Sequence, residues 1–190
     1  MAAESFWTNP GQDPKRAYRF KISITAGAGK TGFGTSQASW YASKADKPKF
    51  SVTETAHKYI NHTFHYPGRV EWENVTVTLV DPVNPDAAKG VATILKESGY
   101  EIPSSTESVT TTINKKSAIK ALGQVKIMQL GDTTNDIVET WILQNAWIQQ
   151  ANFSALDYES EDLSTIELVF RYDWAELLPA EGPVIFRKKP

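Results

Sequence analysis

The residues with the clearest potential for chemistry lie in the stretch Ala26–Gly32, which reads AGAGKTG. Gly29, Lys30 and Thr31 match the end of the phosphate-binding pattern G-x-x-x-x-G-K-[ST], in which backbone amides and the lysine hold phosphate groups and the hydroxyl holds Mg²⁺. The run Val77–Asp81 reads like a strand that ends in a metal-holding aspartate. Together the two features would indicate a nucleotide-binding enzyme.

The surroundings of this stretch argue against a phosphate loop. The first glycine of the pattern should stand five residues before Gly29, and that position is Ile24. A helix must also follow the loop, because its N-terminus supplies part of the anion site. Residues 32–41 instead contain two more glycines and no apolar residues at helical spacing. The stretch is therefore interpreted as a flexible connection, and a nucleotide-binding enzyme is kept only as a remote alternative.

The other residues that could do chemistry also lack the spacing that a site needs. On one continuous strand, His57 and His65 would share a face and His62 would lie on the other, so the three could not converge on one metal ion. The acidic group at 157–162 does not have the spacing of a calcium loop and predicts a solvated hairpin turn. No Gly-x-Ser-x-Gly motif occurs. The residues thus predict no catalytic, cofactor or metal site, and favour a structural or binding protein over an enzyme.

Composition limits the class of protein further. The length of 190 residues suits one domain, and the absence of cysteine excludes disulfides and thiolate zinc sites. A formal net charge of -2 is unlike that of domains that bind nucleic acid by neutralising phosphates. The first residues lack the apolar core of a signal peptide, and no apolar run reaches the length of a membrane helix. We expect synthesis in a cytosol and no membrane anchor.

Alternation of apolar and polar residues predicts mostly β-structure. Strands are expected at 18–25, 50–55, 58–66, 75–79, 125–128 and 165–172, with a turn at Pro67-Gly68 and a bulge near Glu73-Asn74. Residues 108–113 are also rich in β-formers, and 136–149 fits a strand or a helix by spacing, with its composition favouring a strand. The cleanest strand is 165–172, whose predicted core face consists of Ile166, Leu168, Phe170 and Tyr172.

One helix is predicted at 85–98. Asn84 can cap it, Pro85 fits its first turn and Gly99 can end it. Many strands and a single helix indicate a mainly β (α+β) fold, an antiparallel sandwich or barrel with the helix covering one end. The expected organisation is an N-terminal arm at 1–16, one β domain at 17–178 with a long loop at 26–48, and a C-terminal tail at 179–190.

Three segments together resemble one known family. The segment Leu143–Leu177, LQNAWIQQANFSALDYESEDLSTIELVFRYDWAEL, has an apolar-Trp strand, an acidic LDY segment and a strand that closes on YDW. DPKRAYRFKISI resembles an arm entering a first strand, and PGRVEWENVTVTLVDP resembles a middle strand before a helix. Their order and spacing are similar to those of the major tail tube proteins of contractile-tailed bacteriophages, over roughly residues 13–177.

The resemblance implies a structural role in a virion tail. Hexameric rings would stack into a hollow tube inside a sheath, the sheets of neighbouring subunits would close into one barrel, and double-stranded DNA would pass through during ejection into the host. Implied partners are further copies of the chain and the sheath, baseplate and tail terminator proteins, with assembly in the cytoplasm of the host bacterium. The alternative is the tube of a contractile injection or secretion system that moves protein effectors, which the sequence does not separate from a phage tube.

Two sets of residues acquire roles in such a tube. The loop 26–48 becomes a candidate for stacking one ring on the next, through Gly27, Gly29, Lys30, Gly32, Phe33, Gly34, Trp40 and Tyr41. Its glycines would leave it mobile in the free subunit, and its aromatic residues could bury area on docking. The candidates for the wall of the lumen are polar residues on strands, Asn61, Thr63, Thr76 and Thr78.

Overall fold

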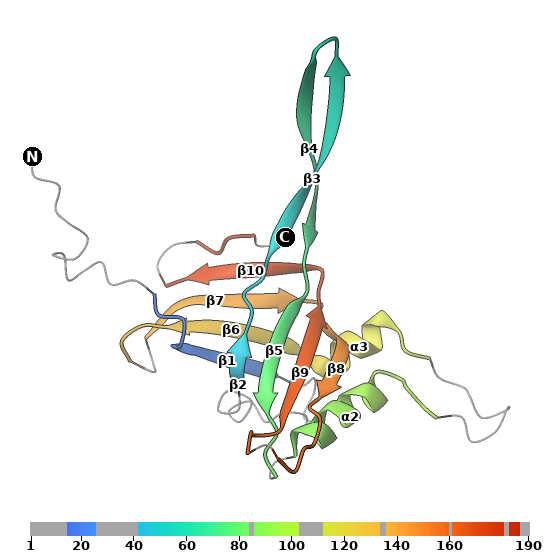
Figure 1. Ribbon diagram of the computed structural model, residues 1–190, viewed down its shortest axis with the longest axis vertical. Coiled ribbons are helices and arrows are strands. Elements are labelled where there is room, and N and C mark those ends of the chain that lie inside the picture. The colour runs from blue at the N-terminus through green and yellow to red at the C-terminus, as the bar shows by residue number, and fades with distance from the viewer. Residues whose placement is uncertain are drawn as a thin grey trace, which may run out of the picture.

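Antiparallel strands make up most of the computed structural model, which describes residues 15–25, 42–83, 86–102, 112–133, 136–159, 161–180 and 183–186 (Figure 1). The elements in chain order are β1 Phe20–Thr25, β2 Ala42–Ala45, β3 Phe50–Tyr59, β4 His62–Trp72, β5 Val75–Val80, α2 Ala87–Glu97, α3 Lys115–Leu122, β6 Gln124–Leu130, β7 Ile137–Gln144, β8 Trp147–Phe153, β9 Thr165–Arg171 and β10 Trp174–Pro179. The mainly β prediction is confirmed.

Two four-stranded sheets enclose the core. One has the strand order β1-β6-β7-β10 and the other β2-β5-β9-β8, and their strands cross one another in Figure 1. A separate two-stranded sheet, β3-β4, extends away from them. The described sheets do not close into a barrel within one chain, so of the two expected arrangements the sandwich is the one found.

Alternation explains the core. Along β5 the residues Val75, Val77 and Leu79 are buried while Thr76 and Thr78 between them are half-buried on the opposite face. β9 pairs with β5 and does the same, so that all four residues expected on its core face lie inside: Ile166, Leu168, Phe170 and Tyr172. One further strand, β10, was not predicted. It follows β9 and pairs with β7.

Helix α2 begins two residues later than predicted. Its cap is Asp86, whose carboxylate accepts a hydrogen bond of 2.8 Å from the Lys89 amide, while Asn84 and Pro85 lie outside the described residues. Its end agrees with the prediction: Gly99 has a φ of 102°, a backbone conformation that residues other than glycine rarely adopt. A Cβ on Gly99 would also lie 2.8 Å from the Thr112 carbonyl oxygen.

A second helix, α3, contradicts the prediction of a single helix. Asn114 caps it by accepting a 2.9 Å hydrogen bond from the Ser117 amide, and Ala118, Ala121 and Leu122 are its buried residues. Helix α3 has only 8 residues, too short to show a clear helical period, and it directly follows a segment rich in β-formers. Of the β-rich segment 108–113, residues 112 and 113 belong to no strand and the others lie outside the described residues.

The segment 50–72 forms one long hairpin, which corrects the predicted turn at Pro67-Gly68. The turn is at Ile60-Asn61, where Ile60 has a φ of 51°. Pro67 lies inside β4 opposite Glu54, beside a bulge between Val52 and Glu54. Proline is tolerated there because both strands of a lone hairpin are edge strands. Glycine is needed at 68 because a Cβ would collide with the Thr53 hydroxyl, which accepts a 2.8 Å hydrogen bond from the Arg69 amide.

Other strand boundaries also differ from the prediction. The segment 136–149 is a strand, as its composition favours, but Asn145, with a φ of 57°, divides it into β7 and β8. Glu73 and Asn74 separate β4 from β5 instead of forming a bulge. Strand β2 lies within the loop expected at 26–48 and pairs with β5, so at least residues 42–45 are not loop.

Candidate functional site

The most exposed part of the described chain is the hairpin β3–β4, which projects from the sandwich along the long axis of the molecule (Figure 1). All 10 residues of β3 are exposed, and so are most of the 11 residues of β4. The exposed residues of the two strands and their turn include large apolar side chains: Phe50, Val52, Tyr59, Ile60, Phe64, Tyr66 and Val70. Since a two-stranded hairpin is at best marginally stable alone in water, this arrangement indicates a surface that a partner covers.

The strand register separates the distal hairpin into two unlike faces. The directly opposed pairs Thr55–Tyr66, His57–Phe64 and Tyr59–His62 point to one side, because paired residues share a face and successive residues alternate. We call this side the aromatic face. The other side carries the pairs Ala56–His65 and Lys58–Thr63. His57 and His62 therefore share a face and His65 lies on the other, which corrects the expectation from a single unbroken strand.

An aromatic cluster anchors the base of the hairpin. The Trp72 ring lies 5.4 Å from the Phe50 ring, 6.0 Å from the Tyr172 ring and 5.7 Å from the Phe186 ring, measured between centroids. Burial raises the pKa of the Tyr172 hydroxyl to about 12, so this group stays neutral at physiological pH. Arg171 adds a polar tie by donating a 2.8 Å hydrogen bond to the Trp72 carbonyl oxygen.

A groove of about 670 Å³ lies beside this base, between the hairpin and helix α3. Its walls include Trp72, Trp147 and Ile113, and its polar rim includes an ion pair of 2.7 Å between Lys115 and Asp173. Partial burial disfavours ionisation of Asp173, but the hydrogen bonds from Lys115 and Asn145 outweigh it and lower the pKa of the carboxyl. The groove therefore combines aromatic and aliphatic walls with one ion pair at its rim.

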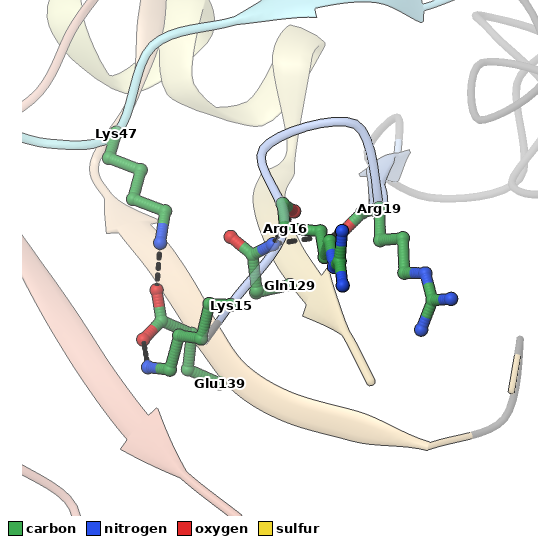
Figure 2. Close-up of polar contacts among 6 residues, drawn as sticks. All are labelled: Lys15, Arg16, Arg19, Lys47, Gln129 and Glu139. Carbon is green, nitrogen blue, oxygen red and sulfur yellow. Dashed lines mark hydrogen bonds and ion pairs between the residues drawn. The ribbon is translucent and has the colours of Figure 1, made fainter. Parts of the chain in front are cut away.

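A second polar cluster fixes the segment that leads into the hairpin. Figure 2 shows Lys15 and Lys47 approaching the two oxygens of the Glu139 carboxylate, one from the start of the described chain and one from the connection between β2 and β3. Burial opposes ionisation of Glu139, yet the two ammonium groups prevail and lower the pKa of this carboxyl. Gln129 holds the same corner by donating hydrogen bonds of 2.6 and 3.0 Å to the carbonyl oxygens of Arg16 and Arg19.

The sheets also present open edges. In the described residues, β1, β2 and β8 each pair with a single neighbouring strand, which leaves the backbone groups of their other side available. The outer edge of β10 is partly covered, because Leu177 and Ile185 exchange two backbone hydrogen bonds of 3.0 and 2.8 Å. Open edges are where sheets of different subunits can join.

The residues that the sequence singled out are found in different places. Thr76 and Thr78 lie on the outer face of the sheet that contains β5, Asn61 lies in the hairpin turn, and Thr63 lies next to it on β4. Whether the four line a lumen stays a prediction. The whole proposed stacking set, from Gly27 to Tyr41, lies outside the described residues, as does the phosphate-loop match, so its role also stays a prediction.

The sequence did not identify the hairpin or the Glu139 cluster as functional. One feature of the sequence could have indicated the hairpin. Its apolar residues lie next to Pro67-Gly68, a pair that can accompany a β-bulge as well as a turn. No group of three or more acidic, histidine or cysteine side chains is placed to hold a metal ion within the described ranges. None of the helices in those ranges is long and apolar enough to cross a membrane.

Comparison with solved structures places this fold among components of contractile particles. A chain of the anti-feeding prophage baseplate matches with a TM-score of 0.61 and 16% identity, over 89% of this chain and 98% of that one. A chain of the sheath/tube terminator of PVC, an extracellular contractile injection system, matches with a TM-score of 0.59 and 17% identity, over 87% and 97%. For a chain of the PVC sheath-tube complex the TM-score is 0.57 and the identity 16%, over 91% and 99%.

The likeness is one of structure. No protein-family model matches the chain, and no curated protein matches its sequence. The fold expected from the resemblance to tail tube proteins is thus the fold found, and the proteins that share it are parts of tail-like machines rather than enzymes.

Proposed function

We propose that this chain is the structural subunit of the tube in a contractile tail or tail-like particle. Copies of the chain would form hexameric rings, and the rings would stack into a hollow channel inside a sheath. The observation that carries the proposal is the fold match over about nine tenths of this chain to a component of a sheath-tube complex. Sheath, baseplate and terminator proteins are the proposed partners, because the matching chains come from a baseplate, a sheath/tube terminator and a sheath-tube complex.

The surfaces described above support assembly by sheet joining. Unpaired backbone groups on edge strands are a template for pairing with another chain, and closure between subunits removes them. The described residues leave edges open on both sheets, and they form a long hairpin whose apolar side chains beyond the base are largely exposed. In a closed ring with point-group symmetry, the edge strands of neighbouring subunits can pair with one another. Closure of the ring then prevents open-ended polymerisation within its plane.

Two cargoes are candidates for the channel. Double-stranded DNA, ejected into a host, is implied by the resemblance of the sequence to phage tail tube proteins. Protein effectors are favoured by the structural matches, which come from an anti-feeding prophage and an extracellular contractile injection system. A wall of threonine and asparagine, with Thr76 and Thr78 on one sheet face, would let a cargo slide because it offers few cations to hold phosphates.

Electron microscopy of the purified protein at high concentration tests the assembly proposal. Rings of six-fold symmetry, or tubes of constant diameter, are the expected result. A protein that remains monomeric by light scattering at every concentration and salt would contradict it. The cargo is decided separately, by isolating intact particles and asking whether nuclease-protected DNA or protein fills the tube.

A further inference from the structure

Glu139 carries a charge in a place where a charge is costly. It lies on β7, an inner strand, on the same face as Trp141 and the buried Leu143. Among the described residues it is the one charged residue that is buried, at 9% exposure. A buried carboxylate must be paired, because burial without a partner disfavours the ionised form. The groups that supply the counter-charge therefore matter to this end of the sandwich.

Two separate segments supply the counter-charge. Lys15 belongs to residues 15–17, which precede β1 and which we call the entry segment, and Lys47 belongs to residues 46–49, the connection between β2 and β3. Each ammonium group pairs with a different oxygen of the carboxylate, Oε2 for Lys15 and Oε1 for Lys47 (Figure 2). The lysine side chains are 49% and 46% exposed, so either of them can leave the carboxylate for water.

The two segments are neighbours around this carboxylate. Ala17 of the entry segment and Lys47 of the connection line one cavity of about 140 Å³, together with Glu139 itself. The buried amide of Gln129 donates a 2.6 Å hydrogen bond to the Arg16 carbonyl oxygen (Figure 2). The attachment of the entry segment thus combines an ion pair with a hydrogen bond to the core face of the sheet.

The connection is tied to the second sheet and to the hairpin. The Asp46 amide donates a hydrogen bond of 2.9 Å to the Thr76 carbonyl oxygen on β5. The Glu73 amide, directly after β4, donates one of 2.9 Å to the Lys49 carbonyl oxygen. The ion pair between Glu139 and the connection therefore links the sheet that contains β7 to the other sheet and to the base of the hairpin.

One negative charge serves two positive charges at this corner. The ammonium groups pair with the two oxygens of a single carboxylate, so they lie close together and repel each other. When one of them leaves, the other is relieved of this repulsion and keeps the whole charge of the carboxylate. Removal of either ammonium group should therefore strengthen the hold on the other.

We propose that the entry segment and the connection compete for Glu139, so that release of the entry segment tightens the link between the two sheets at the base of the hairpin. A partner that draws the N-terminal arm away from the subunit would then stiffen the hairpin base without touching it. Such coupling is reciprocal, so a firmer hold on Lys47 loosens the entry segment by the same factor. The inference concerns the single subunit and is independent of the proposed tube function.

The attachment of the entry segment is measured by proteolysis. Trypsin can cut the folded protein after Arg16 only when the Arg16 carbonyl group leaves Gln129. Lys47→Met removes the charge but keeps the length of the side chain, and should slow this cleavage roughly three- to ten-fold, as expected for partly exposed like charges close together. Lys47→Arg keeps the charge and should be cut at the wild-type rate. Lys116→Met, on the exposed side of α3, is the matched control and should also leave the rate unchanged.

Hydrogen exchange measures the other attachment. Lys15→Met should slow exchange of the Asp46 and Glu73 amides by a similar factor, whereas Glu139→Gln should speed both exchange and cleavage. Circular dichroism of each variant checks that the fold is kept. Faster exchange in Lys15→Met, or faster cleavage in Lys47→Met, would mean that the two attachments support each other. Unchanged rates would mean that they are independent, and either result would overturn the proposed competition.

Discussion

The hairpin β3–β4 and the strand pair β5–β9 are both antiparallel, and both contain apolar residues at alternate positions. They differ in how much of their apolar side the rest of the subunit covers. Phe170 on β9 is 0% exposed under the opposite sheet and the helices, while Phe64 on β4 is 46% exposed on a strand that no other strand covers. Both residues would be assigned to a core from the sequence alone. Alternation of apolar and polar residues thus identifies a strand with an apolar side. It does not indicate whether that side is buried by the same chain or by another chain.

Replacing the buried phenylalanine should have the largest effect. Phe170→Ala leaves a cavity between the sheets and should lower the free energy of unfolding by about 3–5 kcal/mol. That is a large share of the roughly 5–15 kcal/mol that stabilises a typical domain. Denaturant unfolding followed by circular dichroism measures it. An unchanged midpoint would mean that β9 is not the centre of the core, and the contrast with the hairpin would collapse.

The second largest effect on stability should come from the cluster of Glu139, Lys15 and Lys47, which joins the connection before the hairpin to the first sheet. Glu139→Gln removes the charge that holds Lys15 and Lys47, and should lower stability by about 1–2 kcal/mol at pH 7, because hydrogen bonds to charged groups are worth more than neutral ones and the lysines are half-exposed.

The effect of pH on this corner has a definite sign. The pKa of Glu139 is lowered in the folded protein from an ordinary value of 4.5, so the carboxylate stabilises the fold above that value. The contribution is lost as the pH falls from 4.5 through the lowered pKa. Thermal melts of wild type and Glu139→Gln should therefore differ at pH 7 and converge in strong acid. A difference that persists unchanged at pH 2 would assign the effect of the substitution to packing instead of charge.

A substitution in the turn of the hairpin should raise stability instead of lowering it. Ile60→Gly relieves a β-branched residue at positive φ, and should raise the stability of the free subunit by about 0.5–1 kcal/mol, the gain being limited by the greater freedom of glycine in the unfolded chain. Ile60→Val is the matched control, since it keeps the β-branching and the strain. Equal melting temperatures for all three proteins would show that the turn stores no strain.

The sequence predicts those parts of the fold whose pattern lies within a few neighbouring residues. It does not predict parts that depend on contacts between distant residues. Strands β1, β5, β6 and β9 and helix α2 are marked by alternation or caps within a few residues of one another, whereas β2 and β10 were not predicted. The bulge next to Pro67, between the pairs Val52–Val70 and Glu54–Pro67, involves the Thr53 hydroxyl across the hairpin, a contact that no local pattern reveals. The Glu139 cluster joins residues 124 and 92 positions apart, and single lysines and glutamates carry no sign of such pairing. The candidate site was missed because its residues have the pattern of a core strand.

The smallest effect on stability, and the sharpest contrast, should come from the hairpin phenylalanine. Phe64→Ala removes a ring that touches His62, with centroids 4.7 Å apart, but leaves no cavity in the core, so it should change the free energy of unfolding by less than about 1 kcal/mol. Assembly should suffer instead, because the aromatic face loses area that a neighbouring copy would bury. Thr63→Ala, on the other face of the same strand, is the control and should leave both properties unchanged. Unfolding curves and tube yield measured on the same samples separate the two roles: a fall in stability close to that of Phe170→Ala, with normal tubes, would place the hairpin in the fold of the subunit rather than between subunits.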